Sequence, residues 1–101
     1  MLSLIRSDDF VKWLDGLNDQ KARAQILSRL NRAVFGNFGD CEPVGDGISE
    51  MRIHHGPGYR VYFVRSGTVV YVLLCGGTKG TQRRDIAKAK RMAKELEGLQ
   101  K

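Results

Sequence analysis

The side chains best suited to chemistry on an anion lie in the second half of the chain. Arg52 and Arg60 flank the segment His54–Gly58. If that segment is a hairpin loop, the two arginines face each other across an antiparallel ladder, where like charges repel unless an anion or a carboxylate lies between them. This spacing favours an anion site. The alternatives are that each arginine extends into water or pairs with an acidic residue of the first half.

Lys79 is a third candidate for an anion contact. It lies within Gly76–Thr81, which reads Gly-Gly-Thr-Lys-Gly-Thr and follows an apolar stretch. Backbone amides in such a turn, together with the start of a following helix, favour a bound phosphate. The run lacks the Gly-x-x-x-x-Gly-Lys-[Ser/Thr] spacing of a Walker A loop. Lys79 therefore predicts a phosphate contact outside that class of nucleotide-binding loop.

His54 and His55 could act as general acid or base near neutral pH. Adjacent residues of a strand point to opposite faces, so we expect at most one of them on the arginine face, and parity places His54 with Arg52 and Glu50. Adjacent histidines without cysteines or clustered carboxylates make a poor metal site, so no metal ligands are expected. No Ser-His-Asp or Cys-His pattern stands out.

Length and composition predict one ordinary globular domain over residues 1–101. The chain is 42% hydrophobic and 28% charged, and each half alone would have too little interior. No apolar run approaches the roughly 20 residues that cross a bilayer, and no secretory signal is visible, so we expect a cytoplasmic protein without membrane contact. Cys41 and Cys75 are expected to be reduced, with Cys75 buried in a strand, although a bridge between them stays open.

The charge is concentrated in the second half. Residues 1–50 hold six basic and eight acidic side chains, whereas residues 51–101 hold eleven basic and three acidic ones. Such asymmetry favours a surface that attracts a polyanion or an acidic protein partner. The simpler alternative is a solvated basic helix.

The first half predicts one short strand and two helices. Leu2–Ile5 is apolar and could be a first or edge strand. Ser7 suits a helix N-cap, and apolar residues recur at helical spacing over Phe10–Leu17. Asn18 or Asp19 could cap a second helix. Two short helices joined so tightly should form a helical hairpin.

The period then changes to that of strands. Residues 36–47, with four glycines and a proline, read as a loop. Alternation predicts strands over 48–53 and 59–65. The continuous apolar run in 68–74 predicts another strand, covered on both faces and ended by Gly76–Gly77.

A last helix is expected to start near Thr81 or Gln82, with a basic outer surface. The resulting order is β-α-α-β-β-β-α. It describes an α+β domain in which a small antiparallel sheet packs against an N-terminal helical hairpin and a C-terminal helix.

Three strings of the sequence are recognisable in combination. They are VGDGISEMRI (44–53), GPGYRVYF (56–63) and LCGGTKGTQ (74–82), the last followed by Asp85, Ile86 and Ala89. Together they resemble the toxin branch of the RelE/ParE superfamily, specifically the HigB-like, phage Gp49-like addiction module killer proteins. The resemblance covers roughly residues 2–98, and the predicted element order matches the RelE-like fold.

The resemblance implies the toxin of a type II toxin–antitoxin system. Related toxins bind the ribosomal A site and cleave mRNA without a metal or other cofactor: the ribose 2′-OH attacks the adjacent phosphate while basic side chains stabilise the developing charge. By motif, Arg60 matches the family's phosphate-contacting arginine, Lys79 a basic residue after the last strand, and Arg52 an additional anion contact. The catalytic candidates are Arg60, Lys79 and His54. The candidates for contact with RNA or phosphate are Arg52 and three cations of the last predicted helix, Arg83, Arg84 and Lys88. Tyr59 could stack on a base, but its parity favours the core.

The chain departs from those relatives at its C-terminal end. They place a tyrosine, or a histidine–tyrosine pair, there as acid or base, whereas residues 81–101 contain neither. Lys79 or His54 would have to take that role. Two further functions therefore stay open: a ParE-like toxin that inhibits DNA gyrase without a nuclease site, and a non-enzymatic binding partner or corepressor of the antitoxin.

The resemblance also implies the partners. In all three cases we expect a small antitoxin, with a helix-turn-helix domain, encoded by the adjacent gene. The ribosome and mRNA are the further partners of a nuclease, and no small-molecule cofactor is expected.

Overall fold

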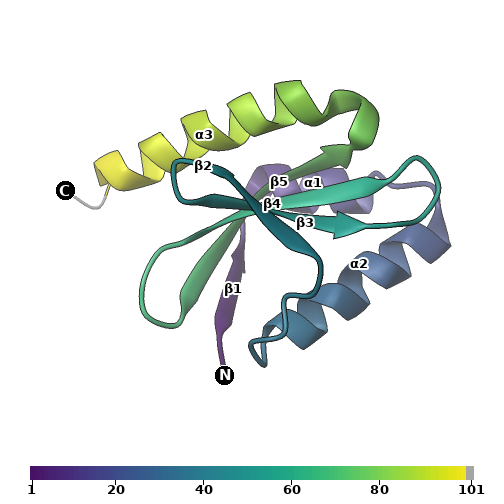
Figure 1. The fold of residues 1–101 in the computed structure, drawn as a ribbon, viewed down its shortest axis with the longest axis horizontal. Coiled ribbons are helices and arrows are strands. Elements are labelled where there is room, and N and C mark those ends of the chain that lie inside the picture. The colour runs from purple at the N-terminus through teal and green to yellow at the C-terminus, as the bar shows by residue number, and fades with distance from the viewer. Residues whose placement is uncertain (100–101) are drawn as a thin grey trace.

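A five-stranded mixed sheet, ordered β1-β5-β4-β3-β2, organises the chain (Figure 1). The computed structural model describes residues 1–99. Its elements are β1 (Ser3–Arg6), α1 (Asp8–Asp15), α2 (Gln20–Ala33), β2 (Cys41–Gly45), β3 (Ile48–Ile53), β4 (Tyr59–Arg65), β5 (Val70–Thr78), the short 3-10 helix η1 (Lys79–Thr81) and α3 (Gln82–Leu99). In Figure 1, α3 covers one face of the sheet, while α1 and α2 lie against the other.

The predicted α+β class is confirmed, but the sheet is mixed rather than wholly antiparallel. Strands β3, β4 and β5 form the expected antiparallel meander. Strand β1 instead pairs in parallel with β5, with Ser3 opposite Val70. The two N-terminal helices carry the chain away after β1, so β1 occupies an edge without a hairpin partner.

The prediction of an uninterrupted loop over residues 36–47 was wrong. Cys41–Gly45 forms β2, which pairs with β3 in an antiparallel hairpin. The turn between them is Asp46 and Gly47, with φ of 56° and 77°. Two central residues with positive φ make the type I′ turn that suits the twist of a hairpin, and Asp-Gly is a preferred pair for it.

The prediction that Gly76 and Gly77 end the last strand was wrong. Strand β5 runs through both to Thr78, and the glycines admit large neighbours on opposite faces of the sheet. A Cβ at residue 76 would lie 2.2 Å from the Trp13 ring, and one at residue 77 would meet the Asp85 carboxylate. Because glycine has no side chain, Trp13 of α1 and Asp85 of α3 can pack directly against the backbone of β5 at these two positions.

The N-terminal helices begin at the predicted caps. Ser7 Oγ accepts a hydrogen bond from Phe10 N at 3.0 Å. Asp19 Oδ1 accepts hydrogen bonds from the backbone amides of Lys21 and Ala22 in the first turn of α2. These acceptors satisfy amides that have no partner inside a helix, which fixes where each helix starts.

Each face of the sheet has its own core. The core under α1 and α2 includes Phe10, Leu14, Ile26, Met51, Val61 and Phe63. The core under α3 includes Ile48, Tyr62, Val72, Leu74, Cys75 and Ala89. Strand alternation thus places Glu50, Arg52 and Arg60 on the α3 face, and Tyr59, 7% exposed, in the opposite core as expected.

Two further features of the described residues bear on the sequence expectations. Cys41 and Cys75 are free thiols, and Cys75 is buried in β5 as predicted. Burial raises the pKa of the Cys75 thiol to about 11. No helix within residues 1–99 is long and apolar enough to traverse a membrane.

Candidate nucleic-acid interface

Five of the residues singled out in the sequence meet in one cleft. Arg52 and Arg60 are directly opposed in the β3–β4 ladder, as the hairpin spacing predicted. The cleft beside them measures about 470 Å³. It is lined by Arg52, His54, His55, Gly56, Pro57, Gly58, Arg60 and Lys79. Two strands, the loop between them and the start of η1 thus contribute to one cationic concavity.

A buried carboxylate lies beneath the two arginines. Glu50 is 1% exposed, and its Oε1 accepts a hydrogen bond from Arg52 Nε at 3.2 Å. Arg60 Nε is 3.5 Å from the other oxygen, Oε2. Arg52 Nη2 also pairs with Glu42 on β2. Both arginines therefore have carboxylate partners from the first half of the chain, which was one of the alternatives open from the sequence.

Two neutral donors complete the surroundings of Glu50. The Tyr62 hydroxyl donates to Oε2 at 3.0 Å, and Gln82 Nε2 at the start of α3 donates to the same oxygen at 2.7 Å. Because a carboxylate oxygen has two lone pairs, the hydrogen bonds from Tyr62 and Gln82 occupy both acceptor positions of Oε2. Arg60 Nε is accordingly buried without a hydrogen bond within the described residues and is held by charge.

Lys79 lies at the mouth of the cleft. Its backbone N donates to Gly58 O at 2.8 Å, which ties η1 to the β3–β4 loop. Gly58 has φ of +80°, and a Cβ there would lie 3.3 Å from Arg60 Nη1. Glycine is thus favoured both by the backbone and by the close guanidinium. The Lys79 side chain is exposed, and no carboxylate among residues 1–99 pairs with it.

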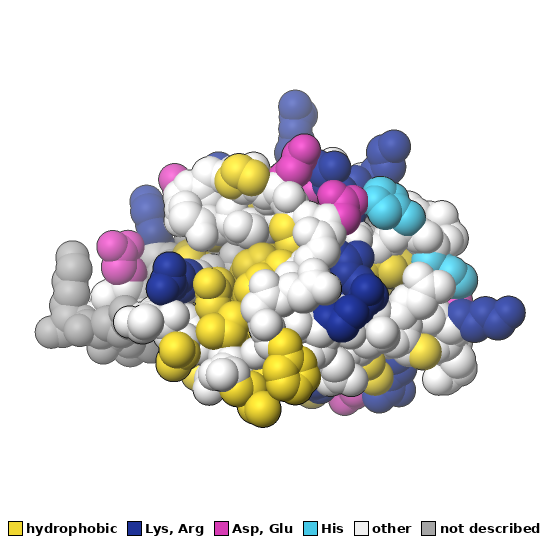
Figure 2. All heavy atoms as spheres, turned by 60° about the horizontal axis from the view of Figure 1, so that its bottom comes forward, with side chains coloured by type: hydrophobic (Ala, Val, Ile, Leu, Met, Phe, Trp, Pro, Cys, Tyr) yellow, Lys and Arg dark blue, Asp and Glu magenta, His cyan; other side chains and the backbone are white. Residues whose placement is uncertain are grey.

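Both histidines line the cleft. The expectation that at most one of them lies on the arginine face concerned positions within a strand, and it stays a prediction. Strand β3 ends at Ile53, and strand alternation no longer applies to the two residues after it. His54 Nε2 lies 2.6 Å from Asp40 Oδ2. His55 Nε2 lies 3.0 Å from Asp19 Oδ2. Figure 2 shows the two imidazoles at the same end of the molecule, each beside charged side chains.

The His54–Asp40 pair has the geometry of an acid–base group. The hydrogen bond from His54 holds the pKa of the Asp40 carboxyl below its usual value. In the neutral imidazole, a proton on Nε2 facing Asp40 leaves Nδ1 as the acceptor. No described residue bonds Nδ1, and the side chain is 75% exposed. His55 differs, since Gln25 contacts its Nδ1 at 3.2 Å and the ring is 23% exposed.

The three cations predicted on the last helix do not line this cleft. Arg83 and Arg84 are exposed on the first turn of α3, and Arg84 Nε is 3.7 Å from Asp85. Lys88 Nζ is 3.8 Å from Asp9 of α1. These side chains extend the cationic character of the surface along α3, outside the lining of the cleft.

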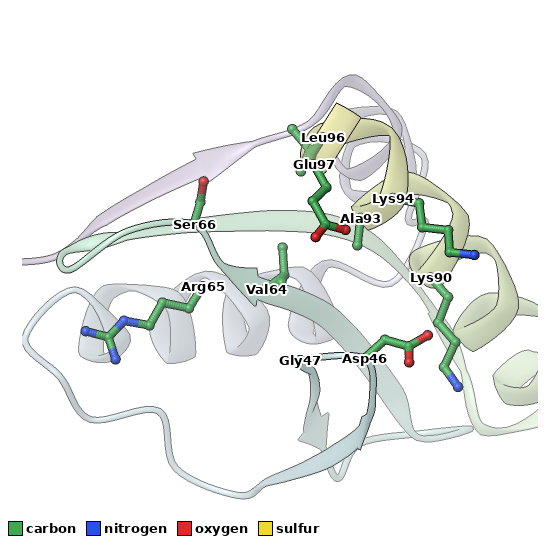
Figure 3. A pocket seen from close by; sticks show the side chains of 10 residues that line it. All are labelled: Asp46, Gly47, Val64, Arg65, Ser66, Lys90, Ala93, Lys94, Leu96 and Glu97. Atoms are coloured by element: carbon green, nitrogen blue, oxygen red, sulfur yellow. The ribbon is translucent and has the colours of Figure 1, made fainter. Parts of the chain in front are cut away.

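A larger cleft, of about 660 Å³, lies at another part of the α3 face (Figure 3). It is bounded by the C-terminal half of α3, the β2–β3 turn and the end of β4. Arg65 reaches away from α3 in Figure 3 and donates to carbonyls of its own turn. None of the residues predicted to be functional lines this cleft, so its size does not make it the candidate site.

The residues that sequence reasoning missed are the ones beneath the arginines. Glu50 was assigned to the arginine face, but not as their shared partner, and neither Tyr62 nor Gln82 was connected with it. Parity alone could have placed Tyr62 on that face. Gln82 reaches the site from 32 positions away in the sequence, which no local pattern indicates. Within residues 1–99, no group of three or more His, Cys, Asp or Glu could hold a metal ion.

Comparisons with known proteins agree with the sequence strings. Residues 12–94 match the model of the family described as phage derived protein Gp49-like (DUF891). The chain belongs to this family. It is also 51% identical over 87 residues to a protein of Haemophilus influenzae described as uncharacterized, an alignment that covers 86% of this chain and 88% of the relative.

Proposed function

We propose that this protein is the toxin of a type II toxin–antitoxin system and that it is a HigB-like member of the RelE/ParE superfamily. Its toxic action would be ribosome-dependent cleavage of mRNA without a metal ion. Membership of the Gp49-like family, a toxin-like family of phage-derived proteins, supports the toxin role. The cleft that gathers Arg52, Arg60, Lys79 and His54 is the observation that supports the nuclease.

The proposed reaction is an intramolecular transesterification. The ribose 2′-oxygen attacks the adjacent phosphorus and loses its proton to a base, the bond to the 5′-oxygen breaks, and that oxygen takes up a proton. His54 is the proposed proton acceptor, through the Nδ1 that its contact with Asp40 leaves open. Arg60 and Lys79 would stabilise the negative charge on the phosphate oxygens as the pentavalent transition state forms.

Arg52 in the cleft and three cations of α3 outside it have a proposed role in binding. Arg52, Arg83, Arg84 and Lys88 would contact RNA phosphates, since such contacts supply most of the sequence-independent affinity of nucleic-acid-binding proteins. The proposed partners are thus the ribosome, mRNA and a neutralising antitoxin with a helix-turn-helix domain, encoded by the adjacent gene. An acidic segment of that antitoxin could cover the same cations.

The decisive experiment is brief induction of the protein in cells that lack the antitoxin, followed by mapping of transcript 5′ ends. We expect growth arrest together with new ends inside translated codons. Arg60→Ala should abolish both while the purified variant still unfolds cooperatively. Arg65→Ala, on the same strand but bonded to its own turn, is the matched control and should remain toxic.

The alternative functions give different outcomes in that experiment. Growth arrest with intact transcripts, an SOS response and gyrase–DNA breaks would indicate a gyrase inhibitor. The internal ion pairs of Arg52 and Arg60 with Glu50 are the observation that favours such a non-catalytic role. Normal growth on expression alone would indicate a binding partner or corepressor of the antitoxin.

A further inference from the structure

We propose that Glu50 is a positioning residue: it holds Arg52 and Arg60 side by side by their Nε atoms, so that the terminal nitrogens of Arg60 and the Nη1 of Arg52 are available to one phosphate. This inference rests on the proposed RNA-directed function. It concerns how the cleft is assembled, and it assigns a role to a residue outside the catalytic set.

Arg52 and Arg60 are close enough to repel each other. Arg52 and Arg60 occupy directly opposed positions of the ladder, where two like charges destabilise a sheet. Their side chains are 26% and 11% exposed, so water screens this repulsion incompletely. A carboxylate between the two Nε atoms compensates it from within the protein, before any ligand binds.

The contacts with Glu50 also set the direction in which each guanidinium points. Glu50 is on the same strand face as the arginines and beneath them, and both contacts to it use Nε. A guanidinium held by its Nε edge still carries two terminal nitrogens, which match the oxygens of a phosphate. Arg60 Nη1 lies beside Gly58, at the wall of the cleft. The pairing with Glu50 thus orients both arginines through Nε and leaves their terminal nitrogens free of Glu50, although Nη2 of Arg52 pairs with Glu42.

The two arginines differ in how Glu50 holds them. Arg52 is fixed by a hydrogen bond to Oε1. Arg60 faces Oε2, whose acceptor capacity is taken by Tyr62 and Gln82, and its buried Nε has no hydrogen bond. Buried donors are almost always satisfied in native proteins. Arg60 is thus held by burial and by the charge of Glu50, whereas Arg52 also has a hydrogen bond to that carboxylate.

Glu50 itself is unsuited to proton transfer with a substrate. Its side chain is 1% exposed, and both oxygens are occupied by donors. A group in that position acts through the arginines, which makes a positioning role the consistent one.

The test combines a spectroscopic signature with ligand binding. In the wild-type protein, the Nε–H protons of Arg52 and Arg60 should exchange with water much more slowly than that of the exposed Arg83. Their signals are assigned with Arg52→Lys and Arg60→Lys variants. Exchange as fast as that of Arg83 for both arginines would overturn the proposal without any change to Glu50.

Binding is measured with a short single-stranded 2′-O-methyl RNA, which contains phosphates but cannot be cleaved through a 2′-hydroxyl. Glu50→Gln keeps the size of the side chain and removes its charge. We expect about tenfold weaker binding and shifted Nε–H signals, since charge-assisted hydrogen bonds are about twice as strong as neutral ones. Glu95→Gln, the matched control on the exposed side of α3, makes the same charge change and should not weaken binding.

Failure of the positioning role and failure of the proposed function give different results. Glu50→Gln protein that binds as tightly as Glu95→Gln, with unaltered arginine signals, overturns the positioning role. Wild-type protein with protected arginines that fails to bind the RNA supports the arrangement around Glu50 and overturns the RNA-directed function. If Glu50→Gln does not fold, the exchange measurement on the wild-type protein decides.

Discussion

The carboxylate of Asp85 lies directly against the backbone of Gly77. A Cβ at residue 77 would be 1.8 Å from Asp85 Oδ2 and 2.9 Å from Thr81 Oγ1. Thr81 in turn donates a hydrogen bond to the same carboxylate oxygen. This contact joins the end of β5 to η1 and the first turn of α3, and η1 is the segment that carries Lys79 to the cleft.

Gly77→Ala should therefore destabilise the protein by about 1–3 kcal/mol, the usual cost of forcing atoms into a filled space. The added methyl must displace Asp85, which is 5% exposed and has little room to move. Denaturant unfolding followed by circular dichroism measures the effect. Because η1 begins at Lys79, the displaced segment should also weaken RNA binding.

Gly80→Ala is the matched control for that substitution. A Cβ at residue 80 would meet only Thr78 Oγ1, at an ordinary 3.7 Å. Replacing glycine where alanine fits stabilises proteins by about 0.4–1 kcal/mol through the unfolded chain. Equal stabilities for the two variants would contradict the contact between Asp85 and Gly77.

Glu42 competes with a ligand for Arg52. Its side chain is 60% exposed and pairs with Arg52 Nη2 from the neighbouring edge strand. Glu42→Gln should release that nitrogen and tighten binding of the 2′-O-methyl RNA about two- to fivefold, the range expected of an exposed ion pair. The gain should shrink as salt is added, because salt screens exposed charges.

The same binding measurement on Glu95→Gln separates this contact from a general change in net charge. Both variants remove one negative charge, but only Glu42 contacts an arginine of the cleft. Equal gains in affinity for the two variants would show that Glu42 does not restrain Arg52.

Local patterns were sufficient to predict the helices, the meander and the facing arginines. Ser7 and Asp19 are caps because their side-chain oxygens reach amides within three residues. The register of Arg52 and Arg60 follows from the length of one hairpin loop. Such features depend on neighbouring residues alone, so a single sequence contains the information.

Strand β2 and the parallel pairing of β1 were missed for different reasons. Pro43 and Gly45 made β2 look like a loop, although proline is tolerated on an edge strand and Asp46-Gly47 is a hairpin signal. For β1, pairing with β5 joins residues nearly seventy positions apart, and no local pattern reports that contact. The shared contacts of Glu50 were missed for the same reason as the pairing of β1, since Gln82 reaches Glu50 from a distant element of the sequence.

Tyr62 should make stability fall at alkaline pH. Burial, with the charge of Glu50 beside it, raises the pKa of Tyr62 far above its ordinary value of 10.0. Above pH 10.0 the tyrosine of the unfolded chain loses its proton, whereas Tyr62 of the folded protein keeps it. The unfolded state therefore binds fewer protons than the folded state. The free energy of unfolding should then fall with rising pH, by up to about 1.4 kcal/mol per pH unit from this group.

The comparison with Tyr62→Phe isolates this effect, because phenylalanine has no proton to lose and the remaining titratable groups are common to both proteins. Urea unfolding of the two proteins should give a constant difference in free energy below the ordinary tyrosine pKa. Above it, the wild-type protein should lose stability faster than the variant. Parallel curves through the alkaline range would contradict a proton held on Tyr62, and with it the hydrogen bond that Tyr62 donates to a charged Glu50.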